Sequence, residues 1–156
     1  MSALYYRCQG RRGFEGASSE WEALEPDPRL ASPRSLHGAV FDLINFQKYT
    51  GTVAFFSNPE LNAVLGQADK IVLHALVNES SGTSPTLSIY CEDSPDAMNW
   101  ANVSTVISAA GIGTTPILLR GEVNTALGRY VRFRIELGGT SPTAVMGVKA
   151  TLRING

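Results

Sequence analysis

The clearest pattern in the chain is an alternation of apolar and polar positions near its C-terminus. In residues 128–137 (GRYVRFRIEL) and 144–154 (AVMGVKATLRI), apolar side chains recur at every second position. A period of two is typical of a strand with one buried face and one face in water. The segment GGTSPT between them has the composition of a turn. The faces in water carry four cations, which we expect to be interface residues: Arg132, Arg134, Lys149 and Arg153.

Shorter runs of apolar and β-branched residues, bounded by turn residues, predict further strands. They lie at residues 40–46, 52–56, 70–77, 86–91, 103–108 and 116–120. Together with the two C-terminal segments they make about eight strands, which predicts an all-β fold, an antiparallel β-sandwich or jelly roll.

Two segments depart from simple alternation. Residues 70–77 (KIVLHALV) are apolar on both faces, so we expect a central strand that is covered on both sides. His74 within it has no second candidate metal ligand nearby, and we interpret it as a structural histidine. Residues 57–67 carry the signals of one short helix, with Asn58 as N-cap, Pro59 at the first helical position and Gly66 at its end.

Residues 1–35 show neither the strand period nor the helix period, and they predict an extended or disordered N-terminal arm before a β-sandwich domain at residues 36–156. Two interpretations of the arm stay open. One is a disordered leader, and the other is an arm that becomes ordered when its aromatic side chains dock on a neighbouring subunit. The aromatic interface candidates in the arm are Tyr5, Tyr6, Phe14 and Trp21.

Composition and charge narrow the range of partners. With 156 residues, 44% hydrophobic and 17% charged, the chain has the size and composition of one globular domain. A net charge of -1 gives no general attraction to nucleic acid or to an anionic membrane, so we expect neither as a partner. The N-terminus lacks the apolar core of a signal peptide, which predicts synthesis in the cytosol, where a disulfide between Cys8 and Cys91 is not expected.

The sequence also lacks the motifs that an enzyme of a common class would need. Its two imidazoles, His37 and His74, lie in no recognisable catalytic motif, and GIGTTP at residues 111–116 lacks the lysine of a phosphate loop. The two cysteines and two histidines do not have the spacing of zinc ligands. We therefore expect a non-enzymatic protein without a cofactor or a metal.

One loop, residues 90–100 (YCEDSPDAMNW), is open to several interpretations. It has three acids, but it lacks the alternating acids and central glycine of an EF-hand calcium loop. We interpret it as a corner in which Pro95 fixes the turn and Trp100 buries its ring at the edge of the sandwich. The alternative is a carbohydrate site, in which aromatic rings stack on sugars and acids accept hydroxyl hydrogen bonds; burial of Trp100 would count against it. The candidate contacts for a glycan are Tyr90, Asp93, Asp96 and Trp100.

Three segments together resemble a known group of proteins. The segments LSIYCEDSPDAMNWANV, LGRYVRFRIELGG and AVMGVKATLRI are similar to small β-sandwich virion structural proteins of tailed bacteriophages, over residues 68–154. The resemblance implies a protein that decorates or stabilises a capsid, or a head or tail accessory part. It further implies a capsid or other virion protein as partner, a homo-oligomer, and a location in the virion after assembly in the cytoplasm of the host bacterium.

Overall fold

The computed structural model describes residues 37–154, so the arm at residues 1–35, with Tyr5, Tyr6, Phe14 and Trp21, lies outside the described residues. All strand pairs are antiparallel, which confirms the predicted all-β antiparallel fold. No helix within the described range is long and apolar enough to cross a membrane. The elements follow in the order β1 (Val40–Thr50), β2 (Phe55–Phe56), the 3-10 helix η2 (Pro59–Leu61), α1 (Asn62–Leu65), β3 (Lys70–Ser94), β4 (Ala101–Gly111), β5 (Ile117–Val123) and β6 (Tyr130–Arg153).

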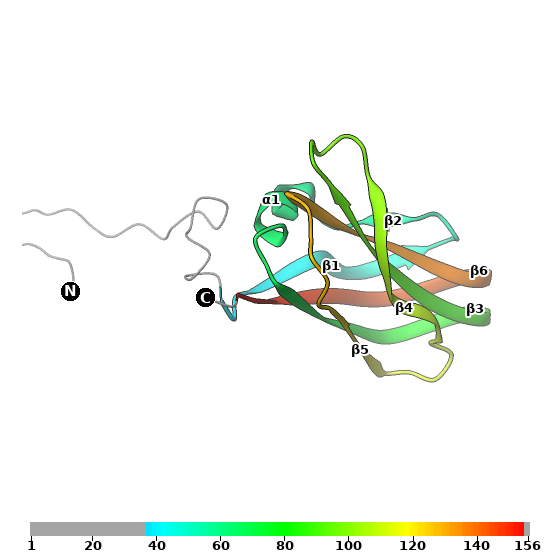
Figure 1. The fold of residues 1–156 in the computed structure, drawn as a ribbon. Helices are drawn as coiled ribbons and strands as arrows, with labels where there is room; N and C mark the ends of the chain where they lie inside the picture. The colour runs from blue at the N-terminus through cyan, green and yellow to red at the C-terminus, as the bar shows by residue number, and fades with distance from the viewer. Residues whose placement is uncertain (1–36, 155–156) are drawn as a thin grey trace, which may run out of the picture. The chain divides into compact units, whose positions relative to one another are not determined.

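The two long strands, β3 and β6, pair with each other from end to end and bend together. Their register runs from Lys70 opposite Arg153 to Ser94 opposite Tyr130, with shifts in the middle. Both strands turn back at the right of Figure 1. The turn is made by residues with positive φ in both strands: Gly82, Ser84, Gly139 and Ser141. Each long strand therefore contributes to two layers of sheet.

We name the layers after their edge strands. The β1 layer consists of β1, residues 143–153 of β6, residues 70–77 of β3, and β5. The β2 layer consists of β2, residues 130–138 of β6, residues 86–94 of β3, and β4. The expected count of eight strands is not confirmed, because two pairs of expected strands are halves of β3 and of β6.

The hydrophobic core lies between the two layers. One cluster of buried side chains draws on both halves of both long strands. Residues 131, 133, 135 and 137 of β6 are buried, and so are residues 144, 146, 148, 150 and 152, as the alternation predicted. Burial of each large apolar side chain contributes roughly 1.5–3 kcal/mol, so this shared interior holds the layers face to face.

Residues 70–77 form a central strand segment, between β6 and β5, as predicted. The expectation that this segment is covered on both sides is wrong for the part of the chain that the structure describes. On the outer face Val72 is buried, but His74 is half-buried and Leu76 is 43% exposed. The inner face of this segment thus lies in the core, and its outer face is covered only at Val72.

The short helical segment begins and ends where the sequence predicts. The Asn58 side chain accepts a hydrogen bond from the backbone N–H of Glu60 at 3.1 Å, and Pro59 opens η2. Gly66 ends α1, but with φ of -66° it is not a left-handed cap. A Cβ atom there would lie 2.0 Å from the carbonyl oxygen of Arg129, so the close approach of another backbone segment requires glycine.

Candidate functional site

The outer face of the β2 layer brings together side chains from β3 and β6. Because Val131, Phe133 and Ile135 point into the core, Arg132 and Arg134 point outward. The cross-strand register places Glu92 of β3 opposite Arg132 and Tyr90 opposite Arg134. Side chains that are directly opposite on one face of an antiparallel pair are close enough to interact.

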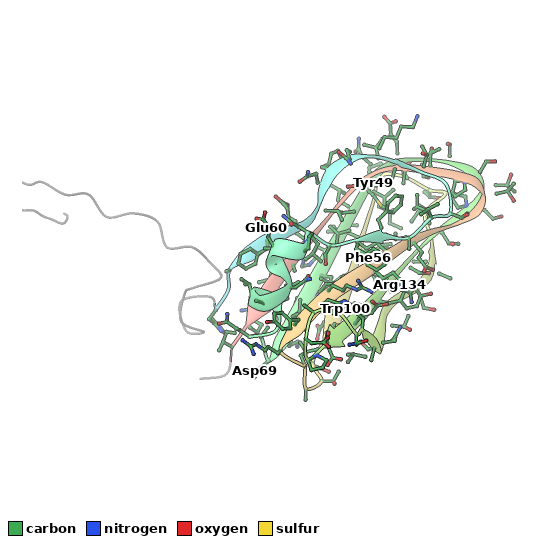
Figure 2. All side chains as sticks on the ribbon, turned by 90° about the horizontal axis from the view of Figure 1, so that it is seen from above. Tyr49, Phe56, Glu60, Asp69, Trp100 and Arg134 are labelled. Atoms are coloured by element: carbon green, nitrogen blue, oxygen red, sulfur yellow. The ribbon has the colours of Figure 1, made fainter. Side chains whose placement is uncertain are left out.

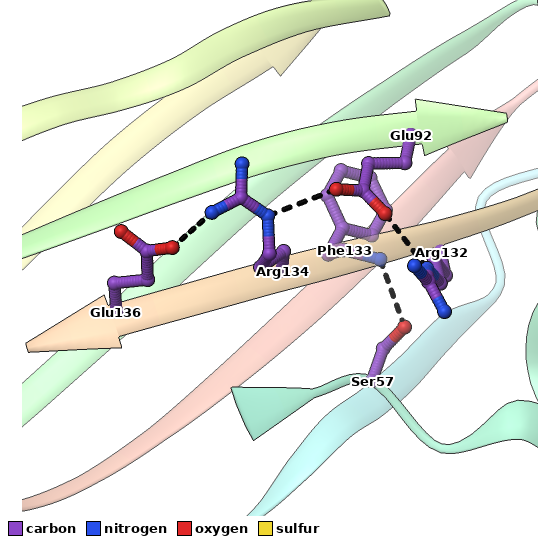
Figure 3. Close-up of polar contacts among 6 residues, drawn as sticks. All are labelled: Ser57, Glu92, Arg132, Phe133, Arg134 and Glu136. Carbon is purple, nitrogen blue, oxygen red and sulfur yellow. Dashed lines mark hydrogen bonds and ion pairs between the residues drawn. The ribbon is translucent and has the colours of Figure 1, made fainter. Parts of the chain in front are cut away.

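Glu92 links the two arginines. Its Oε1 accepts a hydrogen bond from Nε of Arg132 at 2.8 Å, and its Oε2 accepts one from Nε of Arg134 at 2.9 Å. Arg134 also forms an ion pair with Glu136 (Figure 3). Burial opposes ionisation of Glu92, whose side chain is 10% exposed, but the hydrogen bonds from the arginines outweigh it and the pKa of Glu92 lies below its usual value. The acid is therefore charged and held in place at neutral pH.

Aromatic rings cover both guanidinium groups. The guanidinium carbon of Arg132 lies 4.2 Å from the centre of the Phe56 ring and 4.3 Å from that of Trp100. The corresponding carbon of Arg134 lies 4.3 Å from the centre of the Tyr90 ring. Phe56, Trp100 and Arg134 lie near one another in Figure 2. We call this set the aromatic–arginine face; its members are Phe56, Tyr90, Glu92, Trp100, Arg132 and Arg134.

The position of Phe56 is fixed by the next residue, Ser57. The backbone N–H of Ser57 donates to the carbonyl of Phe133 at 2.9 Å. The backbone N–H of Phe133 in turn donates to Oγ of Ser57 at 2.9 Å, the bond drawn in Figure 3. Ser57 is buried, so both bonds are shielded from water. The two-residue strand β2 is thereby anchored to β6, with Phe56 against Arg132.

Trp100 ends a compact loop that joins β3 to β4. The carboxylate of Asp96 accepts hydrogen bonds from the backbone N–H groups of Met98 and Asn99, at 2.9 and 2.8 Å, and from the side chains of Asn99 and Ser94. The backbone bonds from Asn99 and Met98 hold the pKa of Asp96 well below its usual range. The loop is a corner, as predicted, although Trp100 is half-buried rather than buried.

The other acids of this loop are also engaged by the protein itself. Oδ2 of Asp93 accepts a hydrogen bond from the backbone N–H of Gly128 at 2.8 Å, which fastens the end of β3 to the segment before β6. Within residues 37–154, no group of three or more His, Cys, Asp or Glu residues is arranged to hold a metal ion. The acids that the sequence offered for a glycan site, Asp93 and Asp96, therefore act first as internal ties of the loop.

The structure divides the predicted interface cations into two groups. Arg132 and Arg134 belong to the aromatic–arginine face, whereas Lys149 and Arg153 lie in the β1 layer. Lys149 forms an ion pair with Asp42 of β1 at 2.5 Å. Arg132 and Lys149 therefore lie in different halves of β6 and do not face each other across a strand pair.

Sequence reasoning missed two members of the face. The sequence pattern gives Phe56 only a place in the expected strand at residues 52–56, and it gives Glu92 only a place among the three acids of the loop that lacks a calcium motif. The only sequence signal for Phe56 was its position at the end of an apolar run, TVAFF. Nothing in the sequence alone sets β2 beside β6, and this pairing is what brings Phe56 to Arg132.

Comparisons with known proteins bear on the fold. No protein-family model matches the chain, and no curated protein sequence matches it. Among solved structures, the CBM22-1 xylan-binding domain of Xyn10C from Paenibacillus barcinonensis is similar, with a TM-score of 0.52 and 13% identity over 77% of this chain and 85% of that domain. The VP2 subviral particle of infectious bursal disease virus gives a TM-score of 0.49 and 10% identity over 73% of this chain and 32% of that one. The first likeness shows a shared jelly-roll-like β-sandwich fold.

Proposed function

We propose that the chain is a non-enzymatic structural protein of a virion, a capsid decoration or head–tail accessory component, and that the aromatic–arginine face contacts a capsid or other virion protein. The virion part of this proposal is supported by the resemblance carried by residues 87–103, 127–139 and 144–154. The contact surface is argued from the geometry of the face.

The observation that carries the proposal is the position of Arg132. Its guanidinium group contacts the rings of both Phe56 and Trp100, and Glu92 fixes its Nε atom. Few residues carry most of the binding energy of a protein interface, and tryptophan, tyrosine and arginine are enriched among them. An arginine that is already held in one orientation loses little conformational entropy when it binds.

The charge of the face favours a contact that acts at short range. The positive charges of Arg132 and Arg134 are balanced by the negative charges of Glu92 and the neighbouring Glu136, so these four side chains together carry no net charge. Long-range electrostatic steering therefore contributes little, and affinity comes from aromatic surface and from the remaining arginine N–H donors. The arginine side chains are 25% and 26% exposed, which leaves part of each group open to a partner.

A repeated particle would amplify such a contact. One small face of this kind gives a modest affinity, but a chain that binds a shell at many equivalent positions, or as an oligomer, gains effective concentration at each further contact. A decoration or accessory role needs this rigid geometry and no chemical step.

A second candidate function is carbohydrate binding. It is favoured by the half-buried Tyr90 and Trp100 on an outer sheet face, and by the fold shared with a xylan-binding domain. Against it, the rings of Trp100 and Tyr90 each have an arginine over one face, where a sugar ring would otherwise stack. Affinity electrophoresis through gels that contain xylan tests this function directly. Retardation that is lost in Tyr90→Ala would support it.

The virion proposal is tested by locating the protein. The tagged full-length chain is expressed in the cells from which its gene comes, and particles are purified on a density gradient. We expect the wild-type chain in the particle fraction and the double variant Phe56→Ala/Arg132→Ala outside it, with both folded by circular dichroism. A wild-type chain that never sediments with particles would overturn the proposal.

A further inference from the structure

Three large apolar side chains are exposed together on the outer face of the β1 layer. Phe46 of β1 is 54% exposed, Leu76 of β3 43% and Leu118 of β5 62%. Leu76 pairs in register with Leu118 on one side and with Gly147 of β6 on the other. Phe46 lies against Gly147, since a Cβ atom there would be 3.1 Å from the Phe46 ring. The three side chains thus form one apolar row across all four strands of the layer.

A second row, of polar residues, runs beside the apolar row. The register joins Asp42 of β1 to Lys149 of β6, Lys149 to His74 of β3, and His74 to Arg120 of β5. The acid is at the β1 edge and the strongest base is at the β5 edge. Their side chains are 60% and 54% exposed, so both remain accessible beside their ion pairs within the chain.

Each of the two rows on one copy of the chain is complementary to the same row on a second copy that is turned around. When two sheets pack face to face about a twofold axis that runs along the strands between β3 and β6, each cross-strand row meets its own reverse. Phe46 then faces Leu118 of the second copy, and Asp42 faces Arg120 of the second copy. Each contact occurs twice: the apolar row packs against its own reverse, and beside it the polar row forms one Asp42–Arg120 pair at each edge, with Lys149 facing His74 of the second copy between them.

We propose that the outer face of the β1 layer is a self-association surface on which a second copy of this chain packs about such a twofold axis. The choice of a second copy rests on the assembly role proposed above and on the charge pattern. A partner of one charge sign would match only one edge of the row, whereas a reversed copy matches both edges. An apolar row at the centre of an open sheet face is the kind of patch that marks a protein interface.

The first test is the mass of the full-length chain in sedimentation equilibrium. We expect a species of twice the 16.7 kDa chain mass, and a dissociation constant raised about a hundredfold by Leu118→Glu, which places a charge against Phe46 of the second copy. Val53→Glu is the matched control, because Val53 is 72% exposed in the turn between β1 and β2, and it should leave the mass unchanged. A monomeric wild-type chain, or a dimer that survives Leu118→Glu, would overturn the proposal.

The second test uses the charges and is specific to the twofold geometry. Asp42→Arg alone places two arginines opposite each other at both edges, and Arg120→Asp alone places two aspartates there, so each variant should be monomeric. An equimolar mixture restores an opposite pair at both edges, and we expect it to form a heterodimer. A mixture that stays monomeric would overturn the twofold pairing.

These tests separate the two surfaces of the protein. Trp100→Ala alters the aromatic–arginine face and should leave the dimer intact, while Leu118→Glu should leave that face intact. A chain that dimerises but never enters particles would contradict only the proposed virion function. A chain that enters particles as a monomer would contradict only the self-association surface.

Discussion

The guanidinium carbon of Arg132 lies 4.3 Å from the centre of the Trp100 ring, although one residue is in β6 and the other ends the loop before β4. The same carbon lies 4.2 Å from the centre of the Phe56 ring. A planar guanidinium group can stack between two rings while its Nε donates to Glu92, and a lysine ammonium group cannot do both. The side chain of Arg132 in β6 therefore contacts both β2, through Phe56, and the loop before β4, through Trp100.

Arg132→Lys should lower the free energy of unfolding by about 1 kcal/mol, because it keeps the charge but removes the stack and the fixed hydrogen bond. Urea unfolding followed by circular dichroism measures this change. In a Trp21→Phe background, the fluorescence of Trp100 should change as well. Arg153→Lys, at an exposed site on the other layer, is the control and should have no effect. Equal stability of all three proteins would show that the stack contributes nothing.

Glu92→Gln tests the acid that links the arginines. The variant should be less stable than the wild type by about 2 kcal/mol at pH 7, since two charge-assisted hydrogen bonds are weakened. The pKa of Glu92 is lowered in the folded state, so its stabilising contribution is present above the unfolded value near pH 4 and is lost as the pH falls through the folded value. The difference between the two proteins should therefore narrow below about pH 4. The exposed Glu79→Gln provides a control, and a difference that does not depend on pH would contradict the assignment.

Gly82→Ala tests the shared bend of the long strands. A Cβ atom at Gly82 would lie 2.8 Å from the carbonyl oxygens of Ser141 and Thr140, and φ there is +108°. We expect Gly82→Ala to lower the free energy of unfolding by about 3 kcal/mol, because backbone strain and a steric clash act together. Gly111→Ala, where a Cβ atom meets nothing within 4 Å, should be neutral or stabilising by about 0.5 kcal/mol. Thermal unfolding of the two variants side by side checks the contrast, and equal melting temperatures would refute it.

Cys91 should be unreactive in the folded protein. Burial, with Asp93 and Glu92 nearby, raises the pKa of its thiol to about 12, so almost no thiolate exists at neutral pH. In a Cys8→Ser variant, a thiol reagent should label nothing before denaturation and one thiol after it. Rapid labelling of the native variant would mean that this part of the core opens readily.

The sequence pattern was sufficient to predict which face of each strand is buried, but not which strands pair with each other. Alternation in residues 128–137 correctly separates Phe133 and Ile135, in the core, from Arg132 and Arg134, outside it. Pairing is different, because it depends on a bend at which two serines, Ser84 and Ser141, adopt positive φ. The glycines and prolines of this region mark a turn, but serine seldom adopts positive φ, so the sequence does not show that each strand continues through the bend. For the same reason the expected strands at residues 70–77 and 86–91 are parts of one continuous strand, β3, and those at 128–137 and 144–154 are parts of β6.

The candidate site was predictable only in fragments. The sequence offers Tyr90 and Trp100 as glycan contacts and Arg132 and Arg134 as contacts for a protein partner, and the structure places all four on one face. Glu92, which joins the arginines, is 40 residues from Arg132 in the chain. A contact of that separation follows from strand register, which short sequence patterns do not determine.

The most direct measurement is the affinity of the purified full-length chain for particles that were assembled without it. Wild type and Arg153→Ala should bind alike and saturate at a fixed number of copies per particle. Trp100→Ala should bind about thirtyfold more weakly, the loss expected for one central aromatic contact. Equal binding by Trp100→Ala and wild type, or no binding by the wild type, would contradict an assembly role for the aromatic–arginine face.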